Sequence, residues 1–275
     1  MKRLHLVCTS ALATGLALIV QGSVAVADET GPMTPAQVAA ASADPDVVQG
    51  RATMRDPKRD AETLASFTKA AARRNVIGES YLGYLSYMGR GVDQNDRTAA
   101  DWYRRAANAG YSDAQLRLGL MYLYGRDMGG PGKSIARDDA EGMRWIQRAA
   151  DGGNPMALDM IADKLQAPFS SKVTAPLLAK NATTTYEQPT KEDVEDLHKA
   201  MDLYRRAAAQ NDQYAIMALC SQIGFLAQVP DDLFQLCEKK PPFNWNKLFS
   251  RVEINGVDPS LLSSDEFPMT PPTYQ

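Results

Sequence analysis

The sequence predicts an all-α fold in which helix pairs stack into a solenoid, with capping segments at its two ends. Two observations carry this prediction. A segment of about 36 residues recurs along the chain, and each copy holds two stretches whose apolar residues have helical spacing. The composition, 44% hydrophobic and 23% charged over 275 residues, is that of a globular chain.

The repeat is clearest between residues 78–110 and residues 114–153. The matched positions are Leu82-Gly83 with Leu118-Gly119, Gly89 with Gly125, Trp102 with Trp145, and Ala106-Ala107 with Ala149-Ala150. A third copy begins at Ala157 and resumes at Ala200 after an insertion, and an incomplete fourth begins at Ala215. Because residues 64–75 match the second half of a unit, the solenoid is expected to span residues 59–226.

The first helix of each unit has one face suited to close packing. In the second copy, Ala114, Leu118 and Tyr122 fall on one face at the i, i+4, i+8 spacing of a helix. Gly119 lies beside them and removes a side chain where another helix must come close. Neither helix of a unit can bury its apolar face alone, so the units are expected to stack.

The ends of this helix and the pattern of its partner complete the unit. Ser112 with Gln115 predicts a capping box at the start, and Gly125 predicts the end. The second helix carries Trp102 one turn before Ala106-Ala107. The large residue is expected to fill one gap while the alanines admit a close neighbour.

These residues resemble the Sel-1-like repeat, a relative of the tetratricopeptide repeat. The positions that match the family pattern are Leu118-Gly119, Tyr122, Gly125, Ala99, Trp102, Tyr103, Ala106-Ala107 and Gly110. Ser86 departs from the pattern, where a tyrosine is expected, and so does Gly142, where an alanine is expected. The resemblance covers roughly residues 60–225. It implies a right-handed solenoid used for protein recognition, and by itself no catalysis.

The insertion and the chain ends are assigned from their composition. Residues 166–191 are rich in threonine and turn-forming residues and are expected to form a surface loop. Residues 28–58, rich in Ala, Asp and Pro, are expected to form an N-terminal cap or linker with short helices. Residues 227–264 are expected to form a C-terminal cap, followed by a disordered tail over residues 265–275.

The beginning of the chain has the features of an export signal. Lys2 and Arg3 precede an apolar run, and Ala25-Val26-Ala27 offers the small side chains that a signal peptidase accepts. The prediction is a signal peptide over residues 1–27, with a mature chain that starts at Asp28 in the periplasm or outside the cell. The alternative is an uncleaved N-terminal anchor. Contact with a membrane is expected only through this segment, before cleavage.

Export would place Cys220 and Cys237 in an oxidising compartment, where they can pair. A bridge between them would tie the C-terminal cap to the last repeat. It would stabilise the fold by about 3 kcal/mol in the loop-entropy description. The alternative is a pair of unlinked buried thiols.

Composition and motifs argue against several kinds of chemistry. The mature chain would keep one histidine, His198, and a net charge near −5, the formal −3 less Lys2 and Arg3. A zinc site of several His or Cys ligands is then impossible, and binding of nucleic acid through net positive charge is not expected.

Gly132-Lys133-Ser134 resembles the end of a phosphate-binding loop but lacks its first glycine and follows a helix. His198 lies among acidic residues and is expected to be a solvated cap residue. We therefore expect no cofactor, no metal and no enzymatic activity.

The first helices carry residue types that are enriched in protein interfaces. The predicted partner-binding residues are Tyr81, Tyr84, Met88, Arg117, Met121 and Tyr124. They are expected to form a stripe along the concave face. The alternative is that several of them pack within the solenoid.

The main functional hypothesis is a non-enzymatic periplasmic scaffold or adaptor that binds a protein partner on its concave face. One alternative follows from the resemblance: an immunity protein that neutralises a type VI secretion effector such as a phospholipase. A less favoured alternative is an enzyme that binds or hydrolyses β-lactams. The relatives associated with that activity carry a cysteine pair in each repeat, whereas this chain has one pair beyond the signal segment.

Overall fold

The computed structural model describes residues 31–125, 132–174, 188–222 and Cys237. Across these ranges the chain forms helices and no strand, which confirms the all-α prediction. The helices are α1 (Pro35–Ser42), α2 (Pro45–Thr53), α3 (Asp60–Ala72), α4 (Val76–Met88), α5 (Asp96–Asn108), α6 (Ser112–Tyr124), α7 (Asp139–Asp151), α8 (Pro155–Phe169), α10 (Lys191–Ala208) and α11 (Gln213–Gln222). No described helix is long and apolar enough to cross a membrane.

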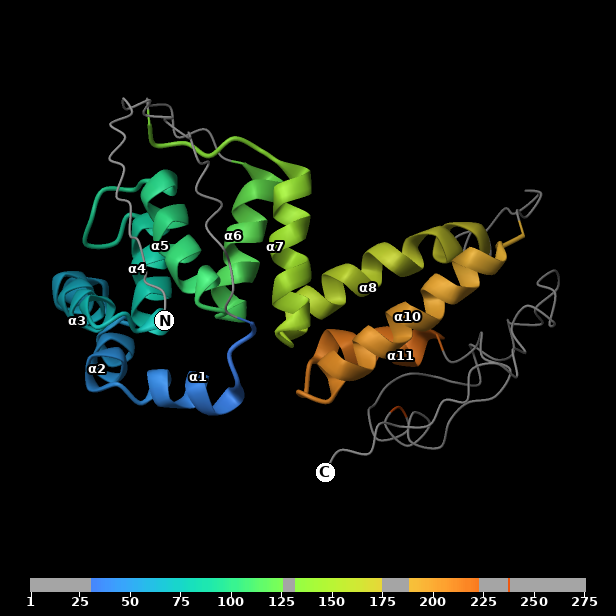
Figure 1. Ribbon diagram of the computed structural model, residues 1–275, viewed down its shortest axis with the longest axis horizontal. Helices are drawn as coiled ribbons and strands as arrows, with labels where there is room; N and C mark the ends of the chain where they lie inside the picture. Colours follow the sequence, from blue (N-terminus) through green and yellow to red (C-terminus); the bar gives the residue numbers. More distant parts are fainter. Residues whose placement is uncertain (1–30, 126–131, 175–187, 223–236, 238–275) are drawn as a thin grey trace, which may run out of the picture.

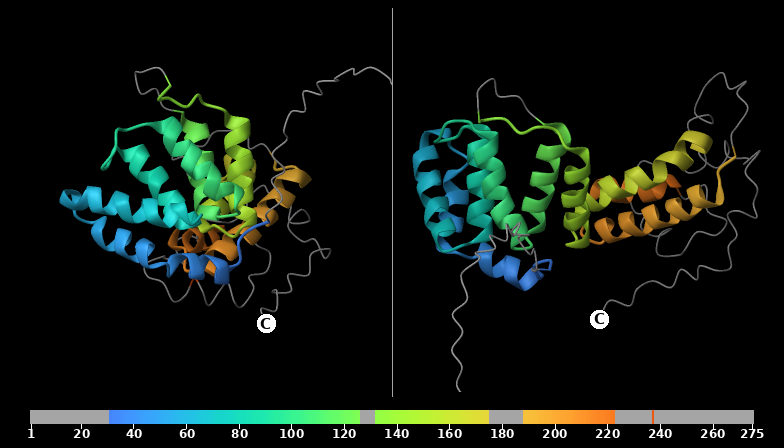
Figure 2. Two further views of the ribbon diagram at one scale, coloured as in Figure 1. Left: turned by 60° about the vertical axis from the view of Figure 1, so that its left-hand side comes forward. Right: turned by 45° about the horizontal axis from the view of Figure 1, so that its top comes forward.

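The helices pack in chain order, each against the next, as a solenoid of helix pairs requires. Figure 1 shows α2 to α7 as one array, from which α8, α10 and α11 extend as a second bundle. The right view in Figure 2 shows the same division. We call α2 to α7 the first stack, and α8, α10 and α11 the second bundle. They are joined by the contact of α7 with α8 and by a hydrogen bond from Arg206 of α10 to the carbonyl oxygen of Ala150 on α7.

Glycines on the first helix of a unit allow this close packing. A Cβ atom at Gly119 of α6 would lie 2.7 Å from Cγ1 of Ile146 and 2.8 Å from the carbonyl oxygen of Gly142, both on α7. A Cβ atom at Gly83 of α4 would lie 2.9 Å from the ring of Tyr103 on α5. The prediction that Gly119 marks a close helix approach is therefore confirmed, and Gly83 does the same in the preceding unit.

Several helices begin at a side-chain cap, whereas the capping box predicted for α6 does not form. Asn75, Asn95, Asp138 and Asn154 cap α4, α5, α7 and α8 by accepting hydrogen bonds from backbone N–H groups. The capping box predicted at Ser112 and Gln115 is wrong.

At α6 the N-cap is Tyr111, which makes no side-chain capping bond. The Gln115 side chain instead donates to the carbonyl oxygen of Ala107 at 3.0 Å, and so joins α6 to the end of α5. Gln115 is only 6% exposed, and its side-chain amide connects the two helices.

The segment before the first predicted repeat is also helical. Val47 of α2 is fully buried, and α2 packs on α3 much as the first helix of a unit packs on its second. Ahead of α1, the backbone N–H of Met33 donates to the carbonyl oxygen of Gly110 at 3.1 Å. The N-terminal segment thus lies against the turn between α5 and α6.

The insertion differs in part from its expected form. Residues 166–169 continue α8, and residues 170–174 form a π-helical turn, so the start of the expected surface loop is helical. The physical reason is Phe169, which is fully buried in a hydrophobic core cluster and anchors the extended helix despite Pro168. Residues 175–187 lie outside the described residues.

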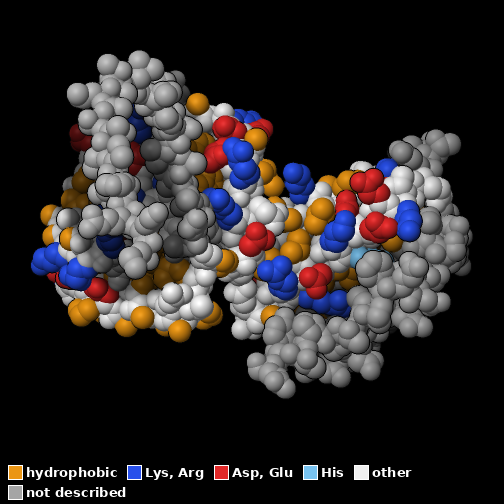
Figure 3. Space-filling view, viewed as in Figure 1, with side chains coloured by type: hydrophobic (Ala, Val, Ile, Leu, Met, Phe, Trp, Pro, Cys, Tyr) orange, Lys and Arg blue, Asp and Glu red, His pale blue; other side chains and the backbone are white. Residues whose placement is uncertain are grey.

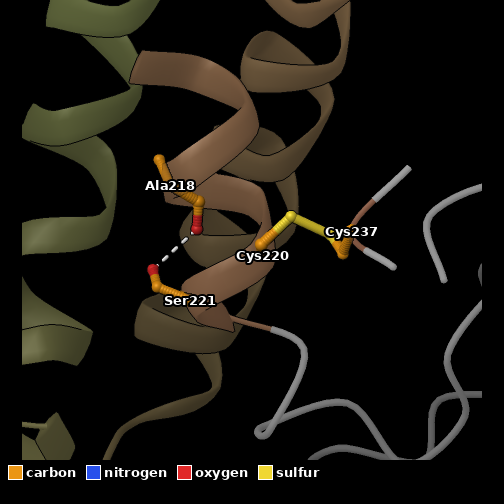
Figure 4. The surroundings of a disulfide bond; sticks show 4 residues. All are labelled: Ala218, Cys220, Ser221 and Cys237. Carbon is orange, nitrogen blue, oxygen red and sulfur yellow. Dashed lines mark hydrogen bonds between the residues drawn. A yellow bond between two sulfur atoms is a disulfide. The ribbon is translucent and has the colours of Figure 1, made fainter. Parts of the chain in front are cut away.

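Cys220 of α11 and Cys237 form a disulfide with an S–S distance of 2.00 Å, drawn in Figure 4. Both residues belong to the core cluster that α8, α10 and α11 share with α6 and α7. Apart from Cys237, the expected C-terminal cap and tail lie outside the described residues, as does the expected signal peptide.

Candidate protein-binding face

The six residues predicted to bind a partner take different positions along α4 and α6. Tyr124 and Met88 are the most open of the large apolar ones, with 75% and 48% of their surface exposed. Arg117 is exposed as well, while Tyr84 and Met121 are half-buried. These five residues stay candidates for contact with a partner.

Tyr81 has a packing role. Its ring stacks on Phe67 of α3 with centroids 4.4 Å apart, and its hydroxyl accepts a hydrogen bond from Nε of Arg51 at 3.2 Å. These contacts join α2, α3 and α4. The alternative of packing within the solenoid therefore fits Tyr81 better than contact with a partner.

A pocket of about 220 Å³ opens between α4, α5 and α6. Its lining residues are Tyr87, Asp96, Tyr103, Arg117, Leu120, Met121, Tyr124, Gly125 and Ile135. Three of the predicted residues, Arg117, Met121 and Tyr124, are thus brought together, whereas Met88 lies outside the lining. An apolar, aromatic-rich hollow with a few polar groups is the usual form of a binding site.

Arg117 lies between two tyrosines from different helices. Its guanidinium carbon is 6.0 Å from the ring centroid of Tyr84 on α4, within cation–π range. Burial raises the pKa of Tyr103 on α5, and the charge and hydrogen bond of Arg117 act against that rise. Contacts to both α4 and α5 therefore orient this exposed cation at the pocket.

Two further contacts hold the helices around the pocket in place. The Arg105 guanidinium of α5 donates to the carboxylate of Glu79 on α4 at 2.7 Å, and Glu79 is only 4% exposed. Burial raises the pKa of Glu79, with Arg105 acting in the opposite direction. The Arg104 guanidinium donates to the hydroxyl of Tyr122 on α6, also at 2.7 Å. The pocket walls are therefore cross-linked from α4 through α5 to α6.

Sequence reasoning missed part of the pocket. Tyr103 matches the family pattern and was interpreted only as a structural position. Tyr87 follows Tyr84 by three residues, so the spacing of a helix already places the two on one side of α4. Ile135 comes from the segment between α6 and α7, and no periodic signal could have placed it beside Tyr87.

The motifs considered for catalysis or cofactor binding lie in surroundings that do not suit those roles. The carbonyl oxygen of Lys133 accepts hydrogen bonds from the backbone N–H groups of Asp96 and Arg97 at the start of α5. The segment thus offers a carbonyl oxygen at a helix start, where a phosphate-binding loop presents converging amides. His198 lies two turns into α10 and is half-buried, and burial lowers its pKa. It is therefore not the solvated cap residue expected from the sequence.

Charged side chains of both signs are mixed over the described part of the chain. Among the residues described, no group of three or more His, Cys, Asp or Glu side chains has an arrangement that could hold a metal ion. Figure 3 shows basic and acidic side chains interspersed over the described surface on that side, without a broad patch of one sign.

The Sel1 repeat family matches residues 77–111, 112–154 and 190–212. The matches coincide with the helix pairs α4–α5 and α6–α7, and with α10. None of the curated proteins is significantly similar to the chain.

Several solved structures are similar to the chain. A Sel1 repeat protein from Oxalobacter formigenes is 26% identical, with 57% of this chain and 94% of that chain covered and a TM-score of 0.39. The protein c5321, a protective antigen of uropathogenic Escherichia coli strains with an SLR fold, is 20% identical, with 80% and 49% covered and a TM-score of 0.38. The immunity protein Pa5087 from Pseudomonas aeruginosa is 15% identical, with 89% and 93% covered and a TM-score of 0.32.

The family matches coincide with the recurring glycines, the buried alanine pairs and the helix pairing described above. Residues 77–111, 112–154 and 190–212 are Sel1 repeats, so the chain carries three copies of this repeat.

Proposed function

We propose that the chain is a non-catalytic scaffold that binds a protein partner through the pocket between α4, α5 and α6. Sel1 repeats generally mediate contacts between proteins, which supports a role of this class. The single observation that carries the assignment to this face is the pocket itself, where Arg117 and the exposed Tyr124 flank an apolar hollow.

The pocket has the chemistry of an anchor site. Its aromatic and aliphatic walls favour one large apolar side chain of the partner, whose burial drives association. Arg117 lies at the same pocket and can donate to a carboxylate or carbonyl oxygen next to that side chain. Because contacts from α4 and α5 orient this cation, little side-chain entropy is lost on binding.

Affinity capture from cell-envelope extract, read by mass spectrometry, tests the proposal. The wild-type chain is expected to enrich a specific protein, and a variant with Arg117→Ala and Tyr124→Ala is expected to lose it. The matched control is Val48→Ala on α2, which removes an exposed apolar side chain away from the pocket. Equal enrichment by the double variant and the wild type would contradict the proposal.

We propose further that the scaffold acts in the periplasm, on the basis of the signal-like residues 1–27. N-terminal sequencing of the protein purified from periplasmic extract should begin at Asp28. The nature of the captured protein then separates the finer roles: a secreted phospholipase would indicate an immunity protein, and an envelope enzyme or receptor would indicate an adaptor.

A further inference from the structure

A second, chemically different site lies in the second bundle, where three aspartates meet. Asp159 and Asp163 come from α8, one helical turn apart, and Asp212 caps the start of α11. Tyr204 of α10 and Tyr214 of α11 close the group. We call these five residues the acidic cluster.

Two of the three carboxylates are well supplied with donors. Asp163 accepts hydrogen bonds from the hydroxyl of Tyr204 at 2.5 Å and from that of Tyr214 at 2.9 Å. Asp212 accepts from the backbone N–H of Tyr214 at 2.9 Å and of Ala215 at 3.1 Å. These contacts fix the positions of both carboxylates.

Asp159 differs from its two neighbours. It is only 7% exposed, and its Oδ1 has no hydrogen-bond partner. Burial, followed by the negative charges of Asp212 and Asp163 and by a hydrogen bond with the Asp212 side chain, raises the pKa of Asp159 to about 7. A buried carboxyl oxygen without a partner is costly, so the retention of Oδ1 beside two other carboxylates calls for a reason.

No cation within the described ranges balances the cluster. The ion pairs formed there use other acids, and none includes Asp159, Asp163 or Asp212. The three aspartates also lack an arrangement suited to a metal ion. A cation bound at the cluster is therefore expected to be organic rather than a metal ion.

The rim of the cluster is open and apolar. Tyr214 is 51% exposed, and Met217 on the next turn of α11 is 71% exposed. Met156, one turn before Asp159 on α8, is 56% exposed. Methionine and tyrosine are enriched in protein interfaces, so this rim fits a polypeptide better than a small hydrophilic ion.

We propose that the acidic cluster receives the ammonium or guanidinium group of a lysine or arginine from a protein partner, with the methionine and tyrosine rim around its aliphatic stem. That the bound group belongs to a protein rests on the proposed scaffold function. The acidic cluster itself is separate from the pocket at Arg117. The cation is balanced by the Asp163 and Asp212 carboxylates, and by Asp159 once that group has released its proton.

This arrangement couples binding to a proton. Near pH 7 the Asp159 carboxyl group is partly protonated, and a cation above it favours the carboxylate. Binding therefore releases protons and becomes tighter as the pH rises through 7. A structural cluster with no ligand would show neither effect.

The test is calorimetric titration of the full chain with acetylated tetralysine amide at pH 7 and low salt, in two buffers of different ionisation enthalpy. The wild type is expected to bind with net proton release. Asp159→Asn with Asp163→Asn is expected to weaken binding by about tenfold or more. The matched control is Asp202→Asn, which removes one exposed acid from α10 and should leave binding within about twofold.

Two results would overturn the proposal: unchanged binding by the double variant, or an equal loss in the Asp202→Asn control, which would mean that only overall negative charge attracts the peptide. If the double variant melts early in circular dichroism, Asp159→Asn alone decides the question. That change keeps the side-chain shape and should abolish proton release, and persistent release would contradict the proposal.

The two sites can fail separately. Arg117→Ala with Tyr124→Ala should keep tetralysine binding, because both residues lie in the first stack. Loss of partner capture with normal tetralysine binding would count against the pocket alone. Normal capture without tetralysine binding would count against the acidic cluster alone.

Discussion

The pocket in the first stack and the acidic cluster in the second bundle are built around tyrosines at the same repeat position. Tyr103 of α5 and Tyr204 of α10 each precede an alanine pair by three residues. Both are buried, and burial raises the pKa of each. Around Tyr103 the neighbouring helices supply Arg117, whereas around Tyr204 they supply Asp163.

This comparison indicates that the first helix of a repeat sets the chemistry of its site. The second helices keep a large buried residue three positions before the alanine pair, Tyr103 in α5, Ile146 in α7 and Tyr204 in α10, together with the small residues that position the backbone. The first helices vary, with Tyr84 and Leu120 at the repeat position where α8 has Asp163. A common scaffold therefore carries a cation at one site and carboxylates at the other.

The largest expected effect comes from breaking the scaffold that both sites share. Gly119→Leu places a side chain where even a Cβ atom would lie 2.7 Å from Ile146 and 2.8 Å from a backbone oxygen. We expect a loss of about 3 kcal/mol or more in the free energy of unfolding. Urea unfolding followed by circular dichroism measures it. A loss below about 1 kcal/mol would mean that α6 and α7 can separate at little cost.

Removal of the disulfide should affect one region only. Replacing Cys220 and Cys237 together by serine releases the 17-residue link and should destabilise the second bundle by about 3 kcal/mol. The first stack contains no cysteine and should keep its protection. Hydrogen exchange read by mass spectrometry separates the regions. Faster exchange across α4 to α6 as well would show that the two regions unfold together.

The pH dependence of stability should come from the second bundle. The pKa of Asp159 is about 7 in the folded chain and 3.8 for an unperturbed aspartate, so the folded state holds this proton more tightly. Its stabilising contribution is complete below pH 4 and is lost as the pH rises to 7 and above.

Asp159→Asn should therefore be more stable than the wild type at pH 8, by about 2 kcal/mol, with a smaller difference at pH 5. Urea unfolding at the two pH values provides the measurement, and Asp202→Asn is the control. An equal effect of Asp159→Asn at both pH values would contradict the assigned titration.

The smallest effect on stability is expected at the pocket rim. Tyr124 is 75% exposed, so Tyr124→Ala should change the free energy of unfolding by less than about 0.5 kcal/mol. Tyr81→Ala should cost about 2 kcal/mol more, because it removes the stack on Phe67. Thermal melts of the two variants give the comparison, and similar losses would mean that Tyr124 is also part of the core.

The recurring positions were enough to predict the helix pairs, because Gly119, Trp145 and the alanine pairs each reflect a contact between neighbouring helices. The extension of α8 to Phe169 was missed, since a threonine-rich composition describes the later insertion and not the buried anchor that begins it. Tyr103 was recognised only as a repeat position. The acidic cluster was invisible in the sequence, because Asp159 and Asp212 are far apart along the chain and only the packing of α8, α10 and α11 brings them together.

The most direct test of the scaffold is photo-crosslinking in cells with p-benzoylphenylalanine at position 124, and with the same residue at position 48 of α2 as the control. Both positions are exposed, so the label itself should be tolerated at each. We expect a discrete adduct with one protein from position 124, lost when Arg117 is changed to alanine, and none from position 48. Adducts from position 48 alone, or from neither position, would contradict binding at this pocket.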